Sequence, residues 1–189
     1  MRFTAAFAIC LASAVPSFAN DYEPKMQEYL DTQIKTWAQN EVLVAAIRAQ
    51  NETTTGYSQD QIDALDQSWR DEVGLTERPT IEPVLQNAAS EFLRSIVAET
   101  GGTVTEVFVM DARGLNVAAS AVTSDFWQGD EAKFSETYPN GDGAVHFGDV
   151  EFDESSQTYQ GQISLTIADP SNGEAVGAMT VGVNAEALF

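Results

Sequence analysis

The stretch Ser124–Phe134 brings aromatic rings, an amide, carboxylates and one lysine together within eleven positions. Small-molecule pockets combine apolar and aromatic walls with a few placed polar groups, so this stretch is a candidate lid over such a pocket. The alternative is a short amphipathic helix in which Phe126, Trp127 and Phe134 are core anchors and the charges are solvated.

The charges near this stretch indicate which ligands it would accept. From residue 104 to the end, Arg113 and Lys133 are the only cationic side chains, against fourteen aspartates and glutamates. A buried polycarboxylate needs several convergent cations to offset its desolvation. We therefore expect a cationic, zwitterionic or neutral ligand. Aromatic rings could face an ammonium group and carboxylates could pair with it; the candidates are Trp127, Tyr138, Asp125, Asp130 and Asp153. For each acid, surface solvation is the alternative.

Catalytic and metal chemistry find little support in the sequence. His146 is the only histidine, Cys10 is the only cysteine, and no Gly-x-Ser-x-Gly turn is present. Histidine-based zinc or copper sites are excluded by count, and a sugar cleft for a two-carboxylate glycosidase has little room on a small sheet. We predict no enzyme activity, no cofactor and no metal. A calcium site is an alternative to a solvated acidic turn, although the spacing of its possible donors does not match an EF-hand: Asn140, Asp142, Asp149, Glu151 and Asp153.

The amino-terminal end predicts export. Arg2, an apolar run from Phe3 to Val15 and the small-residue ending Ser17-Phe18-Ala19 are typical of a signal peptide, residues 1–19. A lipoprotein with Cys10 as its first mature residue is the less favoured alternative. No later apolar run approaches the roughly 20 residues of a membrane span. We expect a soluble periplasmic protein. Its net charge of −20 disfavours nucleic acids and anionic membranes as partners, although solubility alone could explain this acidity.

Helical periodicity dominates residues 20–102. Apolar residues spaced by three, four and seven positions predict one long helix from Pro24 to about Gln50. Ser58 and Gln61 form a capping box that begins a second helix, which continues to Gly74. A third helix is expected from Thr80 or Glu82 to Gly101.

The period changes from about 3.6 to 2 at Thr103 and remains there to the end. Strands are predicted at residues 104–110, 115–121, 145–152, 159–168 and 175–184, with a lid over residues 125–138 between the second and third. Asp111-Ala-Arg-Gly114 has the composition of a hairpin turn. We therefore predict an α+β fold in which helices precede a five-stranded antiparallel sheet, residues 103–189.

This order of elements resembles the single-Cache family of extracytoplasmic sensor domains, whose fold is PAS-like. The resemblance covers nearly all residues after the signal peptide, and it rests on an ordered set of short segments: Glu106–Asp111, Gly114–Val117, Ser124–Asp130, Asp153 and Gly177–Val183. It implies a pocket for a small extracellular ligand between the sheet and the segment after the second strand. By position, the ligand-binding residues would be Asp125, Trp127, Gln128, Asp130, Lys133, Tyr138 and Asp153.

Two hypotheses follow from the sequence. The first is a periplasmic ligand-binding sensor that signals through a separate membrane receptor or kinase, since the chain shows no second hydrophobic span and no signalling module. The second is an interaction module without a small ligand, in which the long first helix forms a homodimer or pairs with another protein. Its apolar stripe, centred on Ile34 and Trp37, could equally be buried on the protein's own sheet.

Overall fold

The protein is described here by a computed structural model that covers residues 22–153 and 158–189, without the side chain of Asp153. The expected signal peptide, residues 1–19, therefore lies outside the described residues. Among those that are described, no helix combines the length and the apolar composition needed to cross a membrane.

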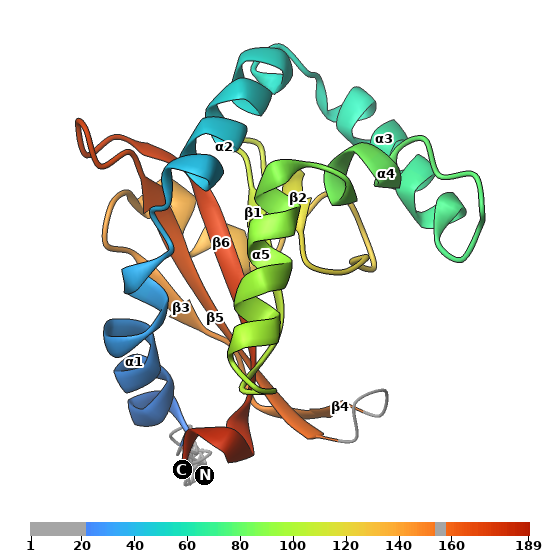
Figure 1. Ribbon diagram of the computed structural model, residues 1–189. Helices are drawn as coiled ribbons and strands as arrows, with labels where there is room; N and C mark the ends of the chain where they lie inside the picture. The colour runs from blue at the N-terminus through green and yellow to red at the C-terminus, as the bar shows by residue number, and fades with distance from the viewer. Residues whose placement is uncertain (1–21, 154–157) are drawn as a thin grey trace, which may run out of the picture.

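An antiparallel sheet forms the centre of the fold (Figure 1). Its strand order is β2-β1-β6-β5-β3, with β4 also paired to β5. The α+β class and the antiparallel sheet that the sequence predicts are confirmed. The strands are β1 (Val104–Met110), β2 (Asn116–Ala119), β3 (Val145–Phe147), β4 (Glu151–Asp153), β5 (Thr158–Ala168) and β6 (Ala175–Asn184).

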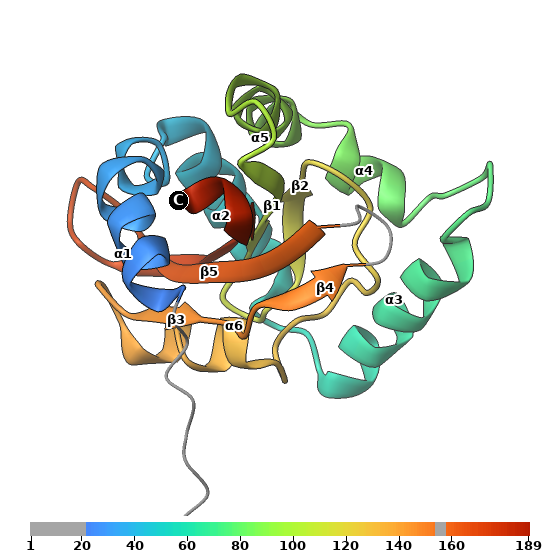
Figure 2. The same cartoon turned by 90° about the horizontal axis from the view of Figure 1, so that it is seen from below.

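Helices cover the two faces of the sheet unequally (Figure 2). Helices α1, α2 and α5 lie on one face, whereas the single turn of α6 lies on the other, and α3 projects to one side. The helices are α1 (Glu23–Thr32), η1 (Ile34–Thr36), α2 (Glu41–Thr54), α3 (Gln59–Glu72), α4 (Ile81–Leu85), α5 (Ala88–Glu99), α6 (Ala132–Ser135), η2 (Tyr138–Asn140) and η3 (Ala185–Leu188).

The main core lies between the sheet and the first of these faces. Met26, Leu30 and Ile34 have no exposed surface, and they belong to one apolar cluster with β-strand residues such as Val181 and Ile163. Complete burial of such a side chain contributes about 1.5–3 kcal/mol. The apolar stripe of the amino-terminal region is therefore core, and it is not available to pair with a second helix.

Two asparagines divide helices that the sequence predicts as continuous. Asn40 accepts a hydrogen bond from the N–H of Val42 and caps α2, which begins this helix anew after η1; with the end of α1 at Thr32, three elements replace one long helix. Asn87 accepts from the N–H of Ser90 and caps α5, which separates α4 from α5. Both residues have extended rather than helical ψ angles, as N-caps require. The predicted capping box of Ser58 and Gln61 is confirmed at the start of α3.

The predicted third strand is two short strands, because its register against β5 shifts. Four residue steps separate Phe147 from Glu151, whereas three separate their partners Ile163 and Gln160. The extra residue is a β-bulge, which bends a strand and interrupts its ladder. Gly148 lies at this point and still donates its N–H to the carbonyl of Gln162.

The close approach of β6 to β1 gives the first prediction. A Cβ at Gly177 would overlap the carbonyl oxygen of Met110, whereas one at Gly148 would meet the Cβ of Gln162 at 3.4 Å, an ordinary contact. We expect Gly177→Ala to lower the free energy of unfolding by about 2–3 kcal/mol, the cost of overpacking a core. Gly148→Ala, the control, should cost much less, as measured by urea denaturation. Equal losses would show that the contact with Met110 is not limiting.

Candidate ligand-binding site

The face of the sheet under α6, called the lid face below, is defined by strand register. Neighbouring partners across the sheet form one row of Ala119, Phe108, Thr180, Ser164 and His146. A second row contains Asn116, Met110, Ala178 and Thr166. Directly opposed residues in a sheet point to the same side, so the side chains of each row lie next to one another.

The two central strands carry hydroxyl groups on the lid face. Ser164 and Thr180 have no exposed surface, and their hydroxyl oxygens lie 3.0 Å apart. Thr166 is 4% exposed, and its Oγ1 has no hydrogen-bond partner among the described residues. The opposite face of the same strands is apolar, with Ile163, Leu165 and Ile167 in the main core. The lid face is therefore polar in its centre and apolar toward Phe108 and Met110.

The lid segment, residues 125–138, covers part of this face through α6 and through Tyr138, the first residue of η2. Phe134 is buried and stacks on Tyr138 at 5.5 Å between ring centroids. Phe134 packs with Phe108, Met110 and Ala178 of the sheet. The Lys133 Nζ lies 5.5 Å from the centroid of the Phe108 ring and 3.0 Å from a carboxylate oxygen of Glu131. The lid segment therefore covers the apolar part of the lid face, at Phe108, Met110 and Ala178.

Two buried amides at the entrance to the lid segment have unpaired oxygens. The Nδ2 of Asn116 and the Nε2 of Gln128 both donate to the carbonyl oxygen of Asp125, at 3.0 and 3.1 Å. These bonds fix which end of each amide is the NH₂ group. The Oδ1 of Asn116 and the Oε1 of Gln128 then have no partner among the described residues, although both side chains are at most 1% exposed. Buried acceptors of this kind normally have a donor, so each needs one from outside the described atoms.

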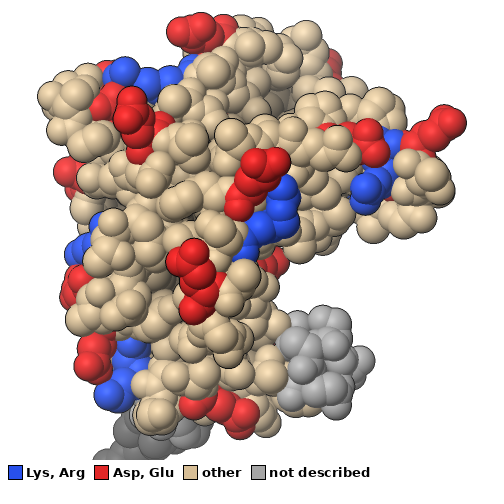
Figure 3. Space-filling model, viewed as in Figure 1, with Lys and Arg blue, Asp and Glu red and all other residues tan. Residues whose placement is uncertain are grey.

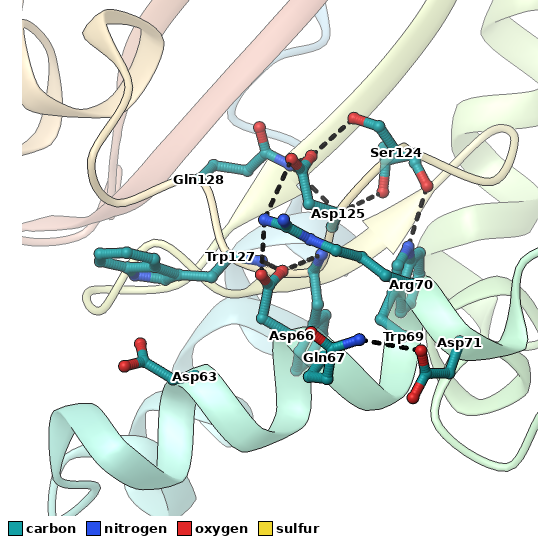
Figure 4. A network of polar contacts seen from close by, with 12 residues as sticks. Asp63, Asp66, Gln67, Trp69, Arg70, Asp71, Ser124, Asp125, Trp127 and Gln128 are labelled. Carbon is teal, nitrogen blue, oxygen red and sulfur yellow. Dashed lines mark hydrogen bonds and ion pairs between the residues drawn. The ribbon is translucent and has the colours of Figure 1, made fainter.

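Helix α3 holds the start of the lid segment in place (Figure 4). The Oδ1 of Asp66 accepts the backbone N–H groups of Phe126 and Trp127 at 2.8 and 3.0 Å. Arg70 lies 2.7 Å from the Oδ2 of Asp66 and 3.6 Å from the Oδ2 of Asp125. Asp125 also accepts the Nε2 of Gln128 through its Oδ1 at 3.0 Å. A continuous polar chain therefore runs from α3 to the unpaired Gln128 oxygen.

The turn between β1 and β2 also holds this segment, through hydrogen bonds to its carbonyl groups. Asp111 is fully buried, and its carboxylate accepts from Gln50, Thr54, Arg113 and Leu115 at 2.8–3.0 Å. This fixes the loop whose carbonyls receive the lid segment: the indole N–H of Trp127 donates to Arg113 and the backbone N–H of Gln128 donates to Gly114. Gly114 has φ +79°, and a Cβ there would lie 2.6 Å from Gly129.

The structure separates the sequence-predicted residues into two groups and two isolated positions. Asp125, Trp127 and Gln128 lie together beside α3, but Figure 4 shows the indole of Trp127 pointing away from the other two. Lys133 and Tyr138 lie on the lid segment with α6 and η2. Asp130 is exposed. Asp153 ends β4, and its side chain lies outside the described part of the structure.

Trp127 has a structural contact in place of the predicted cap over a hollow. Its ring packs at the edge of the apolar cluster of Trp69, Leu115 and Phe126, and it would overlap a Cβ at Gly129. The alternative interpretation of the aromatic residues as core anchors fits Phe126 well, since it is 8% exposed and stacks on Trp69 at 5.3 Å.

Four further residues belong to the site and are not predicted from the sequence: Asp66, Arg70, Asn116 and Thr166. The position of Asp66 could have been noticed in the sequence, because it lies four residues after Ile62 and three before Trp69, within the apolar stripe of its helix. An acid in that stripe must be paired or exposed. Asn116 and Thr166 are part of the site only through strand register, which the sequence does not reveal.

Two of the hollows that described residues line lie on the opposite face of the sheet and beside the β3 edge, respectively. A groove of about 410 Å³ between α2, α4 and α5 is lined by residues including Val42, Ala46 and Val84. A hollow of about 280 Å³ lies between Lys35, Asp142 and Thr166. Within the described residues, no three histidine, cysteine, aspartate or glutamate side chains are arranged to hold a metal ion.

Comparison with known proteins gives partial likenesses at low identity. No family model matches the chain, and no curated protein matches it. The ligand-binding domain of the Campylobacter jejuni chemoreceptor Tlp3, in complex with 4-methylisoleucine, has a TM-score of 0.42 and 11% identity over 88% of this chain and 61% of that one. The sensor domain of the V. cholerae histidine kinase DctB has a TM-score of 0.44 and 14% identity over 88% of this chain and 55% of that one.

An extracellular ligand-binding receptor from Desulfohalobium retbaense has a TM-score of 0.40 and 12% identity, over 80% of this chain and 26% of that one. The chain thus spans less than two thirds of the length of each of these three proteins. Function must be inferred from the residues of the chain itself.

Tyr138 gives a prediction about alkaline pH. Burial, together with the nearby carboxylates of Asp111 and Glu174, raises the pKa of Tyr138 above its ordinary value of about 10. The folded protein therefore keeps this proton to higher pH than the unfolded chain. Its contribution to stability is complete below pH 10 and is lost as the pH rises through the folded pKa.

We expect Tyr138→Phe, which keeps the ring that stacks on Phe134, to reduce the loss of stability above pH 10. Denaturation midpoints measured across that range would show the change. Tyr29→Phe provides a comparison, because burial also raises the pKa of Tyr29. An unchanged alkaline profile in Tyr138→Phe would mean that folding does not change the pKa of this phenol, contrary to the expected shift.

Proposed function

We propose that the protein is an exported sensor domain that binds a small ligand between the lid face and the lid segment. One observation carries this proposal. Of the four buried side-chain polar atoms without a partner in the described part of the chain, three belong to the lid face or the segment above it: Asn116 Oδ1, Gln128 Oε1 and Thr166 Oγ1. An unmade hydrogen bond to a buried polar atom costs about 1–3 kcal/mol, so a partner that supplies it is strongly favoured.

The unpaired atoms favour ligands that donate hydrogen bonds. Amide oxygens only accept, and the Thr166 hydroxyl can do either. Lys133 is the one cation seen on the lid segment, and it already pairs with Glu131. An amine, an amino acid or a neutral polar compound therefore suits the site better than a polycarboxylate. Phe108, Met110 and Ala178 would contact its apolar part.

The lid segment is suited to opening. Its helix α6 has four residues and η2 has three, and both are held to the sheet largely by the stacked pair of Phe134 and Tyr138. Short elements with few buried anchors open at low free-energy cost. Occupancy would therefore change the position of the lid segment, and a separate membrane receptor or kinase would detect it.

Thermal-shift screening against amines, amino acids, small polar neutral compounds and dicarboxylates tests the proposal directly. We expect at least one donor-bearing compound to raise the melting temperature, with isothermal titration calorimetry confirming one site. Stabilisation by dicarboxylates alone would contradict the proposed ligand class. Absence of any shift across the panel would count against the ligand site as a whole.

Thr166→Val separates ligand binding from stability. The change keeps the shape of the side chain and removes a hydroxyl that has no partner, so the free protein should be as stable as the parent or more so. Binding of the compound found in the screen should weaken about three- to tenfold, the value of one hydrogen bond.

Thr180→Val is the matched control on the neighbouring strand. It removes a hydroxyl that is paired with Ser164, so it should lower the melting temperature of the free protein. Loss of stability in Thr166→Val with no change in affinity would show that its hydroxyl has a structural partner and does not meet the ligand.

A further inference from the structure

Helix α3 packs on α4, where Glu72 accepts the N–H groups of Thr80 and Ile81, and it also contacts residues 123–127, which lead into the lid segment. Figure 1 shows α3 at one side of the fold, away from the helices that cover the sheet. Its Trp69 stacks on Phe126 and donates its indole N–H to the carbonyl of Thr123 at 2.9 Å. Movement of α3 would therefore move this stretch of chain.

Asp66 provides the polar part of that attachment. The residue is 8% exposed, and one of its carboxylate oxygens accepts two successive backbone N–H groups, those of Phe126 and Trp127. Hydrogen bonds to an ionised acceptor are roughly twice as strong as those between neutral groups. Without this carboxylate, two N–H groups at consecutive positions would lose their acceptor. The next residue along the chain is Gln128.

Arg70 connects Asp66 to the ligand-site amides. It pairs with Asp66 at 2.7 Å and approaches Asp125 at 3.6 Å. Asp125 in turn accepts from Gln128 through its side chain and its carbonyl oxygen, and that carbonyl also receives Asn116. The carboxylate on α3 and the two amide side chains whose oxygens are unpaired therefore belong to one connected set of contacts.

We propose that Asp66 is a positioning residue for the ligand site, and that ligand binding and the docking of α3 are coupled. This inference rests on the proposed function for its ligand. Asp66 acts through the backbone of residues 126 and 127, which sets where Gln128 lies; it does not itself contact the ligand. A ligand that engages Gln128 strengthens the docking of α3, and by thermodynamic reciprocity docked α3 strengthens ligand binding by the same factor.

The first test needs no ligand. Hydrogen exchange is measured at the amides of Phe126 and Trp127 in the parent, in Asp66→Ala and in Asp63→Ala. Asp63 is exposed one turn earlier on the same helix, where it accepts a bond from Gln59 of its own helix. We expect exchange to accelerate about tenfold or more in Asp66→Ala, since a charge-assisted bond is lost, and to remain unchanged in Asp63→Ala. Unchanged exchange in Asp66→Ala would overturn the positioning role.

The second test measures the affinity for the compound identified by thermal shift. Asp66→Ala should weaken binding about tenfold, and Asp66→Asn, which keeps one acceptor oxygen, should recover part of that loss. Asp63→Ala should bind like the parent. An equal loss in Asp63→Ala would mean that the charge of α3 acts at long range, and it would overturn the inference.

The third test examines reciprocity. Bound compound should slow exchange at Phe126 and Trp127 in the parent, and unchanged exchange there would show that ligand binding and α3 docking are independent.

If Asp66→Ala does not fold, Arg70→Ala replaces it in these tests. Arg70 is half exposed, and the hydrogen bonds that Asp66 accepts from both N–H groups remain possible without it. Arg70→Ala should weaken binding less than tenfold but measurably, and parent-like binding would exclude the link through Asp125.

The first and second tests distinguish failure of the two proposals. If no compound binds, the ligand function fails, while exchange at Phe126 and Trp127 still decides whether Asp66 positions the segment. If a compound binds and none of the α3 variants changes its affinity, the ligand function stands and the coupling fails.

Discussion

The buried carboxylate of Asp111 is the interaction on which the arrangement of the site depends. It joins the end of α2, through Gln50 and Thr54, to the turn between β1 and β2. Only when that turn is fixed do the carbonyls of Arg113 and Gly114 face the N–H groups of Trp127 and Gln128. The helical half of the chain thus determines where the lid segment begins, although the two are far apart in sequence.

The two faces of the sheet use the same strands for different purposes. One face contributes Val181, Ile163 and other apolar side chains to the main core, and their burial stabilises the folded state. The lid face places Ser164, Thr166 and Thr180 in a buried position, where hydroxyls add little stability even when paired. Small polar residues at the centre of a sheet contribute little to packing alone, and this difference is the reason for proposing the ligand site on the lid face.

The sequence predicted those parts of the fold that are encoded locally. The change of period at Thr103, the limits of β1, the turn at Asp111 and the capping box of α3 are all found in the structure. The divisions at Asn40 and Asn87 were missed because an apolar stripe continues across both caps, and only the backbone angles reveal the break. Of the site, Asp125 and Gln128 could be named from composition. The contributions of Asp66, Asn116 and Thr166 depend on contacts across tens of residues, which a single sequence does not specify.

The use that the protein makes of its own carboxylates determines which acceptors are left to bind a ligand. Several carboxylates are already used as acceptors for the protein's own backbone: Asp66 for Phe126 and Trp127, Asp111 for Arg113 and Leu115, and Glu72 for Thr80 and Ile81. On the face drawn in Figure 3, other acids are spread over the surface, and some of them lie beside basic residues. Among the described residues, the buried acceptors left unpaired are the neutral amides of Asn116 and Gln128 and the hydroxyl of Thr166. A neutral acceptor contributes about 0.5–1.5 kcal/mol, less than a charged one. Recognition through such groups favours moderate affinity, which allows a ligand to leave as its concentration falls.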